Sequence, residues 1–374
     1  MRKRMKKYGI MPALSVVMVW ICMAMDLSVA KGDESLPAHE KNGGTVTIVD
    51  CAKRRVQIPA KVRRIGCLYA FSGHAAVMLG RCNDIVAVSN GLKRDSLLLD
   101  ICPAITGALV PKAQGAVNLE ELLRAQTDLV FVSGETGRNR GTVEKLDRMK
   151  IPWLVVDYDS MKGQQAAVEL IGKALGNPEK AARYNRYYRE CVERVQKVTS
   201  KIPEAQKFRL YHSVNEANRT TIEKGLATDW LEVEGVINVS LKPDMNLLEG
   251  RNFVSLEQIL LWDPDVILVN EPTVRKHIMH DMQWSTIKAV KAKRVYQMPI
   301  AISRWGHPGS IETPLAILWT AKRLYPERFP NLDMPLETKA FYRDFFDFEL
   351  PDDLVDKILS GKLVRKPKKD SSLF

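Results

Sequence analysis

The chain has 374 residues, of which 45% are apolar and 27% charged, and its formal net charge is +12. This length exceeds one ordinary hydrophobic core and predicts two domains, and the apolar share excludes a disordered chain and a polytopic membrane protein. The positive charge favours anionic ligands or surfaces, but no arginine-rich run is interleaved with aromatics, so we expect no nucleic-acid partner.

The first thirty residues differ from the rest of the chain. A basic run at residues 2–7 precedes an apolar stretch at residues 10–25, and Ser28 and Ala30 are small residues at the positions that a signal peptidase reads. We interpret residues 1–30 as a signal peptide, which predicts a periplasmic or otherwise extracytoplasmic protein. An uncleaved anchor is the alternative, because the apolar stretch is long for a signal and short for a membrane span.

Five cysteines follow this segment, and an odd number in an oxidising compartment leaves at least one unpaired. Cys67, Cys82 and Cys102 lie near one another in the sequence, so we expect one disulfide among them, with its pairing open. There is no C-x-x-C pair, and hence no signal for a zinc knuckle or covalently attached haem.

From residue 45 onward, short apolar runs alternate with helical patterns. We expect strands at 45–49, 64–68, 85–88, 129–132 and 153–156 and helices at 75–79 and 143–149, with Ser72 or Gly73 capping the helix at 75–79. This alternation predicts an α/β lobe with a largely parallel sheet over residues 31–162.

Residues 163–200 break the alternation. Apolar residues recur there every three or four positions, interrupted by Pro178, which predicts a short helix followed by a long one. About twenty helical residues span ~30 Å, enough to connect two lobes.

The alternation resumes over residues 201–325, which we expect to form the C-terminal lobe. Strands are predicted at 208–212, 266–269 and 294–298, and helices at 229–233 and 313–324. Residues 326–374 form a C-terminal extension whose aromatic cluster, residues 341–348, predicts a helix packed back on the body.

One unit of the sequence occurs twice, as residues 117–132 (VNLEELLRAQTDLVFV) and residues 254–269 (VSLEQILLWDPDVILV). In each copy a polar residue, Asn118 or Ser255, can cap a short helix, and Asp128 or Asp265 opens an apolar run typical of a buried parallel strand. The repeat predicts one architectural unit built twice, with a chance likeness of two helix–strand pairs as the alternative.

Matched sets of catalytic groups are missing from the sequence. There is no G-x-S-x-G elbow, Gly-rich phosphate loop or H-E-x-x-H motif, so we predict no catalytic residues, no resident cofactor and no protein metal site.

Two loops that follow core strands carry groups suited to ligand binding. Tyr69 and His74 follow the strand at 64–68, and Arg304, Trp305 and His307 follow the strand at 294–298. Loops at the carboxyl ends of parallel strands line a cleft, and this set would suit a large, flat or anionic metal chelate. The alternative is that Trp305 packs internally and the histidines cap turns.

With the basic–apolar leader, two α/β lobes, one long helix and the repeated unit, the chain resembles the helical-backbone class of periplasmic binding proteins that serve ABC importers of iron–siderophores, haem and cobalamin. The resemblance covers residues 45–325. It implies that the ligand lies between two lobes that move little, and that one surface carboxylate per lobe pairs with arginines of the membrane subunits. Glu120 and Glu257 hold matching positions in the repeat and are the expected docking residues; a helix-dipole preference for acids is the alternative.

The resemblance implies a monomeric, non-enzymatic receptor that captures an iron chelate of the siderophore type and delivers it to an ABC permease and its ATPase. Stacking on Tyr69 and Trp305 and charge pairing with Arg304, Lys93 and Arg94 would hold the chelate. Alternative ligands are haem, cobalamin or another metal complex, with Tyr69, His74 or His307 bonded to the metal. Trp305 falls where cobalamin-binding relatives have a tryptophan, but residues 106–115 lack the second one. A chelatase-like enzyme of similar architecture is the remaining alternative.

Overall fold

The computed structural model describes residues 44–113, 116–221, 225–241 and 252–363. All of them belong to one structural unit, residues 43–374. The predicted signal peptide, residues 1–30, lies outside the described residues. In the described ranges, no helix is long and apolar enough to cross a bilayer.

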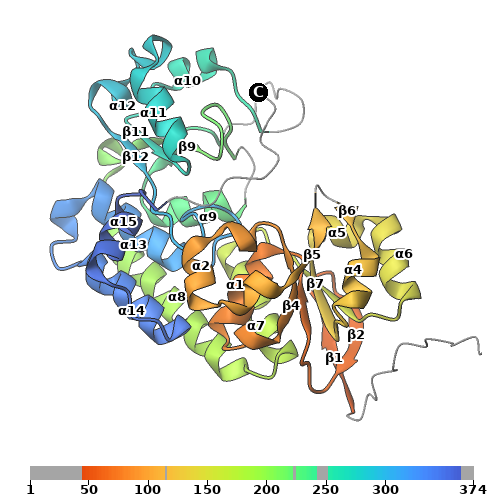
Figure 1. Cartoon of the computed structure of the whole chain (residues 1–374). Coiled ribbons are helices and arrows are strands. Elements are labelled where there is room, and N and C mark those ends of the chain that lie inside the picture. The colour runs from red at the N-terminus through yellow and green to blue at the C-terminus, as the bar shows by residue number, and fades with distance from the viewer. Residues whose placement is uncertain (1–43, 114–115, 222–224, 242–251, 364–374) are drawn as a thin grey trace, which may run out of the picture. The chain divides into compact units, whose positions relative to one another are not determined.

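The N-terminal lobe is built on a six-stranded sheet with strand order β6-β5-β4-β3-β7-β8 (Figure 1). Neighbouring strands run parallel except β5 and β6. The strands are β3 (Ile65–Cys67), β4 (Ile85–Ser89), β5 (Leu109–Ala113), β6 (Ala116–Val117), β7 (Leu129–Ser133) and β8 (Trp153–Val156). Along β7, Leu129 and Phe131 belong to one apolar core and Val130 and Val132 to another. Both faces of the sheet are therefore buried, as its continuous apolar runs predict.

Helices cover the two faces of this sheet (Figure 1). On one face lie α1 (Ala70–Met78) and α7 (Met161–Ala174), and on the other α4 (Leu119–Arg124) and α6 (Arg140–Arg148). Shorter elements complete the lobe: η1 (Cys82–Asp84), η2 (Leu92–Arg94), α2 (Ser96–Ile101), α3 (Ala104–Gly107) and α5 (Gly134–Arg138). A hairpin of β1 (Thr45–Val49) and β2 (Arg55–Pro59) attaches to β8 through a Cys51 N–H···O=C Val155 bond of 3.1 Å.

The C-terminal lobe has a four-stranded, all-parallel sheet with strand order β10-β9-β11-β12. Its strands are β9 (Arg209–Ser213), β10 (Ile237–Asn238), β11 (Val266–Val269) and β12 (Val295–Gln297). The helical elements are α9 (Leu226–Val233), α10 (Leu256–Trp262), α11 (Pro272–His280), η4 (Met282–Trp284), α12 (Lys288–Lys291) and α13 (Thr313–Leu324). The prediction of an α/β chain with two mainly parallel sheets is confirmed.

The repeated aspartates make the same bonds in both lobes. The Asp128 carboxylate accepts from the backbone N–H of Arg64 at 3.0 Å, just before β3, and the Asp265 carboxylate accepts from the N–H of Arg209 at 3.0 Å, at the start of β9. Each aspartate therefore fixes the register between its own strand and the neighbouring one. The capping prediction also holds, because the Asn118 and Ser255 side chains accept from Glu121 and Gln258 N–H groups.

The predicted long helix is α8 (Pro178–Thr199), which has 22 residues and a capping Asn177. Its buried residues recur every three or four positions and include Tyr184, Tyr188 and Val195. It packs against α7 and against α13 of the C-terminal lobe, so helices of both lobes share its surface. The linking segment also contains η3 (Glu204–Gln206).

The C-terminal extension is helical, as its aromatic cluster predicts. It contains η5 (Pro326–Arg328), α14 (Met334–Phe346) and α15 (Asp352–Leu359). Phe341, Tyr342, Phe345 and Phe346 of α14 are buried, and Phe341 and Phe345 pack against Tyr184 of α8.

Two local features refine the predictions for the N-terminal lobe. The first helix begins at Ala70 rather than after Ser72 or Gly73, because the Ser72 hydroxyl donates to the Tyr69 carbonyl at 2.7 Å inside the first turn instead of accepting as a cap. The expected disulfide is present, and it joins Cys82 to Cys102 while Cys67 is a buried free thiol.

Candidate functional site

Two tyrosines lie just beyond the carboxyl ends of strands in the first sheet, one after a central strand and one after an edge strand. Tyr69 follows β3 and Tyr158 follows β8, and their hydroxyls are 3.1 Å apart. Tyr158 O–H in turn donates to the Pro308 carbonyl at 3.1 Å, in the loop after β12. This chain of bonds brings the predicted residue Tyr69 beside the second predicted loop.

Tyr69 is held as a neutral phenol. Burial raises the pKa of Tyr69, and burial also raises the pKa of Tyr158 well above its ordinary value. A phenolate is the form that ligates ferric iron, and this environment opposes it.

His307 lies in the same loop, with a defined arrangement of its ring nitrogens. Its Nδ1 accepts from the Gly309 backbone N–H at 3.2 Å, so the neutral ring carries its hydrogen on Nε2. In that form Nε2 is a hydrogen-bond donor. Metal ligation through Nε2 would require the hydrogen to move to Nδ1, which would break the bond with Gly309.

Arg304 stands where three strands of the second sheet end. Its guanidinium donates to the Asn215 side chain after β9 and pairs with the Glu271 carboxylate after β11. The Arg304 side chain is 16% exposed, so its guanidinium is largely buried and its charge is paired with that of Glu271. Asn215 and Glu271 were not singled out in the sequence, although both follow predicted strands.

His74 and Trp305 are buried, contrary to their expected ligand contact. His74 lies in the second turn of α1, is 3% exposed, and its Nε2 is 3.4 Å from the buried Asp95 carboxylate. Trp305 is 0% exposed, which leaves no ring face for stacking in this structure. Gly306 has a φ of +72° and lies close to Met298 and Trp230, and this turn directs the indole inward.

Two buried hydrogen bonds hold the backbone at Trp305 in place. His212 Nε2 donates to Asn270 Oδ1 at 2.9 Å, and Asn270 Nδ2 donates to the Trp305 carbonyl at 2.7 Å. Burial lowers the pKa of His212 to about 4, so the ring is neutral at physiological pH. This histidine is therefore a structural group.

Lys93 and Arg94 lie in η2, after β4. Lys93 Nζ donates to the Thr106 carbonyl at 3.0 Å, which directs it toward α3, and burial lowers the pKa of Lys93. Arg94 is half-buried. The Lys93 bond is therefore made to α3 and not to the loop after β12.

Both expected docking carboxylates are exposed at the starts of short helices. Glu257 is the second residue of α10, and its own backbone N–H and the Ser255 hydroxyl lower the pKa of Glu257. Glu120 is the second residue of α4 and lines a surface hollow together with Lys145 and Arg148 of α6. The matched acids therefore have different electrostatic surroundings.

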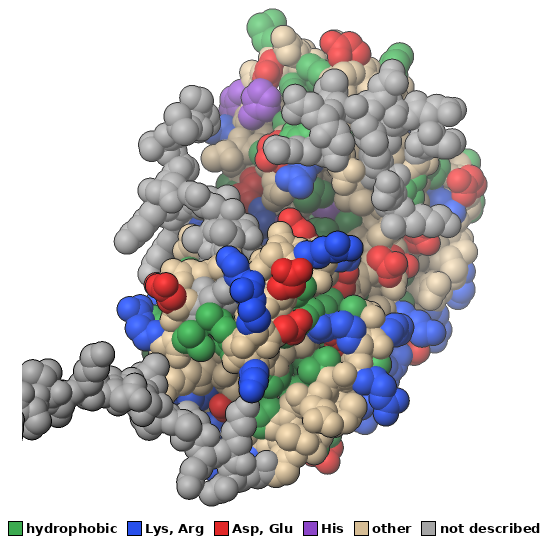
Figure 2. Space-filling model, turned by 90° about the vertical axis from the view of Figure 1, so that its right-hand side faces the viewer, with side chains coloured by type: hydrophobic (Ala, Val, Ile, Leu, Met, Phe, Trp, Pro, Cys, Tyr) green, Lys and Arg blue, Asp and Glu red, His purple; other side chains and the backbone are tan. Residues whose placement is uncertain are grey.

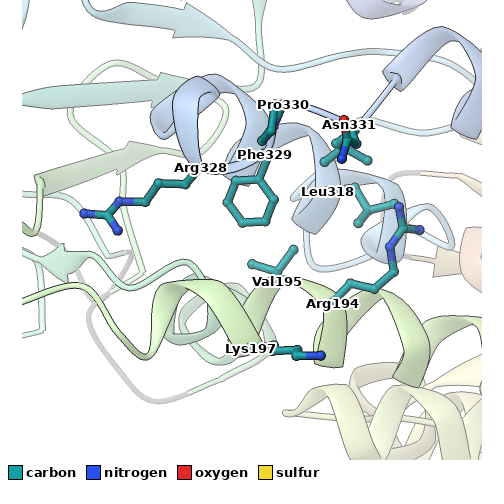
Figure 3. A pocket seen from close by; sticks show the side chains of 9 residues that line it. Arg194, Val195, Lys197, Leu318, Arg328, Phe329, Pro330 and Asn331 are labelled. Atoms are coloured by element: carbon teal, nitrogen blue, oxygen red, sulfur yellow. The ribbon is translucent and has the colours of Figure 1, made fainter.

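The rest of the described surface offers weaker candidates. On the face shown in Figure 2, Lys and Arg side chains are interspersed with Asp and Glu. Figure 3 shows a hollow walled by Val195, Leu318 and Phe329 and rimmed by Arg194, Lys197 and Arg328. Arg194 pairs with Glu337 and Arg328 donates to Gln206, so we assign this hollow no ligand. Residues 44–113, 116–221, 225–241 and 252–363 contain no cluster of three potential metal-ligating side chains.

The sequence matches the profile of a known protein family and is similar to a known relative. The sequence profile of the periplasmic binding protein family matches residues 109–301. The molybdate-binding protein MolA of Haemophilus influenzae is 28% identical over 326 residues, covering 80% of this chain and 90% of MolA.

Solved structures share the fold. The structure of MolA bound to molybdate superposes with a TM-score of 0.73 at 24% identity and covers 82% of this chain and 99% of that one. Helicobacter pylori CeuE, in a complex with nickel and histidine, gives a TM-score of 0.69 at 22% identity, with 84% and 99% coverage.

The relatives serve as substrate-binding proteins and not as enzymes, and they bind a transported substrate in place of a resident cofactor. They act outside the cytoplasm together with the permease of an ABC transporter. This chain belongs to the periplasmic binding protein family and is an extracytoplasmic substrate-binding protein of an ABC importer.

Proposed function

We propose that this binding protein captures a metal-containing anion at the strand ends near Tyr69, Arg304 and His307 and delivers it to its importer. The observation that carries the proposal is the chemistry of two side chains in the loop after β12. Arg304 carries a guanidinium that pairs with Glu271, and the neutral His307 ring carries its hydrogen on Nε2 because its Nδ1 accepts from Gly309. Donors of this kind bind oxyanions and carboxylates.

A compact oxyanion such as molybdate is the ligand that this arrangement supports best. The 28% identical relative is named for molybdate binding, and the buried position of Trp305 removes one of the two rings expected to stack on a large chelate. An anionic iron chelate of the siderophore type is the second candidate, supported by the half-buried Tyr69 ring beside the same donors.

Direct coordination of haem or another metal complex has less support. Burial raises the pKa of Tyr69, and the bond from Gly309 to His307 Nδ1 leaves the ring hydrogen on Nε2. Both effects oppose metal ligation by these side chains.

For docking, we propose that Glu120 and Glu257 pair with cationic side chains of the permease, which an ATPase subunit drives. Support comes from their exposure at equivalent helix starts in the two lobes. The chain would act as a monomer, and its segments would be the signal peptide 1–30, lobes 31–162 and 201–325, connecting helix 163–200 and extension 326–374.

The test is calorimetric titration of the purified protein with molybdate, sulfate, a ferric siderophore and haem. We expect molybdate to bind and Arg304→Ala to weaken it about tenfold or more, because a charged hydrogen bond contributes about 1.5–3 kcal/mol. Lys357→Ala, which breaks an exposed pair with Asp353 on α15, is the matched control and should leave affinity unchanged.

Other outcomes would redirect the assignment. Tight binding of the ferric siderophore alone would select the second candidate. A haem absorption band that Tyr69→Phe or His307→Ala abolishes would refute the anion proposal and establish coordination.

A further inference from the structure

The C-terminal extension reaches the loop that carries Arg304 and His307. Tyr342 of α14 is 0% exposed, and its hydroxyl donates to the Glu312 carboxylate. The same hydroxyl accepts from the Ile302 backbone N–H at 3.3 Å. One side chain of the extension therefore bonds to both flanks of the segment between residues 302 and 312.

Glu312 connects the two ends of that segment. Its other carboxylate oxygen accepts from the Ser303 backbone N–H at 2.8 Å and from the Ser303 hydroxyl at 2.6 Å. The Ser303 and Ser310 hydroxyls are 2.7 Å apart, and Ser310 Oγ accepts from the Glu312 N–H at 3.0 Å. Residues 303 and 310 are thus joined to each other, and the half-buried residues Arg304, His307 and Pro308 lie between them.

The carboxyl end of the loop has additional anchors in the connecting helices. Tyr184 of α8 donates to the Ile311 carbonyl at 2.7 Å, and Gln164 of α7 donates to the Ser310 carbonyl at 2.9 Å. At the amino end, the Ile302 N–H donates to Tyr342 and the Ser303 N–H and hydroxyl donate to Glu312. Loss of the Tyr342 hydroxyl should therefore affect the amino end more than the carboxyl end.

We propose that Tyr342 and Glu312 are positioning residues that hold the loop 302–310 in its ligand-binding conformation. Through Tyr342, the C-terminal extension would then help to shape the binding site. The inference rests on the proposed function only in that this loop is taken to contact the anion. Both residues lie beyond residues 109–301, the part matched by the family profile.

The test compares Tyr342→Phe with Tyr187→Phe. Both tyrosines pack against Phe341 of α14, but the Tyr187 hydroxyl has no nitrogen or oxygen hydrogen-bond partner among the described residues. For Tyr342→Phe we expect faster hydrogen exchange at the Ile302 and Ser303 amides, by about tenfold, with exchange in β11 unchanged. Molybdate affinity should fall about three- to tenfold, and Tyr187→Phe should leave both measurements unchanged.

Two variants of Glu312 distinguish a loss of loop positioning from misfolding of the protein. In Glu312→Gln the amide oxygen can still accept from Ser303 and the amide NH2 can donate to the Tyr342 oxygen, but the Tyr342 hydrogen loses its acceptor. We therefore expect Glu312→Gln to lose less affinity than Glu312→Ala, which removes all of these bonds. Equal loop exchange and equal affinity in Tyr342→Phe and Tyr187→Phe would overturn the inference.

The exchange measurement needs no ligand, which separates the two proposals. Faster loop exchange in Tyr342→Phe without binding of any anion would support positioning by Tyr342 and refute the proposed ligand class. Strong molybdate binding with unaltered loop exchange would support the ligand class and refute positioning.

Discussion

Glu234 should make the stability of this protein fall as the pH rises. It caps the carboxyl end of α9, is 0% exposed, and neither carboxyl oxygen has a hydrogen-bond partner among the described residues. Burial raises the pKa of Glu234 well above its ordinary value. We therefore predict that Glu234→Gln, which keeps the shape and removes the titration, stabilises the protein at neutral pH.

The sign and size follow from proton linkage. Below the ordinary carboxyl pKa, near 4.5, Glu234 is protonated in both the folded and the unfolded chain, so its titration contributes nothing to stability. Above it the unfolded carboxyl ionises while the folded one stays protonated, so folding must take up a proton. The free energy of unfolding then falls by about 1.4 kcal/mol per pH unit until the raised folded pKa is reached.

The assay is urea unfolding of the wild type and of Glu234→Gln at pH 4.5, 5.5 and 6.5. We expect the difference in the free energy of unfolding between the two proteins to grow as the pH rises, by at most about 1.4 kcal/mol per pH unit. His212 titrates in the same window in both proteins, so its contribution cancels. Glu232→Gln changes an exposed position on the same helix. Its free energy of unfolding should differ from that of the wild type by an amount that is independent of pH. A pH-independent effect of Glu234→Gln would refute the reasoning, since it would mean that the folded carboxyl is ionised.

Docking and the disulfide can be tested with two double variants. Glu120→Ala combined with Glu257→Ala should leave anion binding normal in calorimetry but abolish cellular uptake, and normal uptake would remove the docking role. Cys82→Ser combined with Cys102→Ser should lose about 3 kcal/mol of stability, because the bond closes a loop with a sequence separation of 20. Thermal unfolding with and without reductant checks this, since reductant should lower the wild-type midpoint and leave the variant unaffected.

The architecture was predictable because its causes are local and repeated. Asp128 and Asp265 recur since each must accept from the backbone at the start of a neighbouring strand, and the buried strands are continuous apolar runs. Asn118 and Ser255 could be identified as caps because capping depends on residues three positions away.

The site was only partly predictable because it depends on contacts between distant residues. Trp305 lies in a loop without periodicity, and its burial is decided by Asn270, Trp230 and Met298. Tyr158 was missed although its signal was present, since it follows a buried strand by two residues, just as Tyr69 does. The network between Glu312 and Tyr342 joins positions 30 apart, with no pattern linking them in the sequence.

The loop after β12 is bonded to both lobes by groups of the protein itself. Tyr158 and Gln164 donate to its Pro308 and Ser310 carbonyls from the first half of the chain, and Asn270 donates to its Trp305 carbonyl from the second. A site held in this way loses little conformational entropy on binding. Any ligand that displaced the loop would break several of these bonds, at about 1 kcal/mol each. The same bonds that make the loop rigid therefore oppose a ligand-induced rearrangement of it.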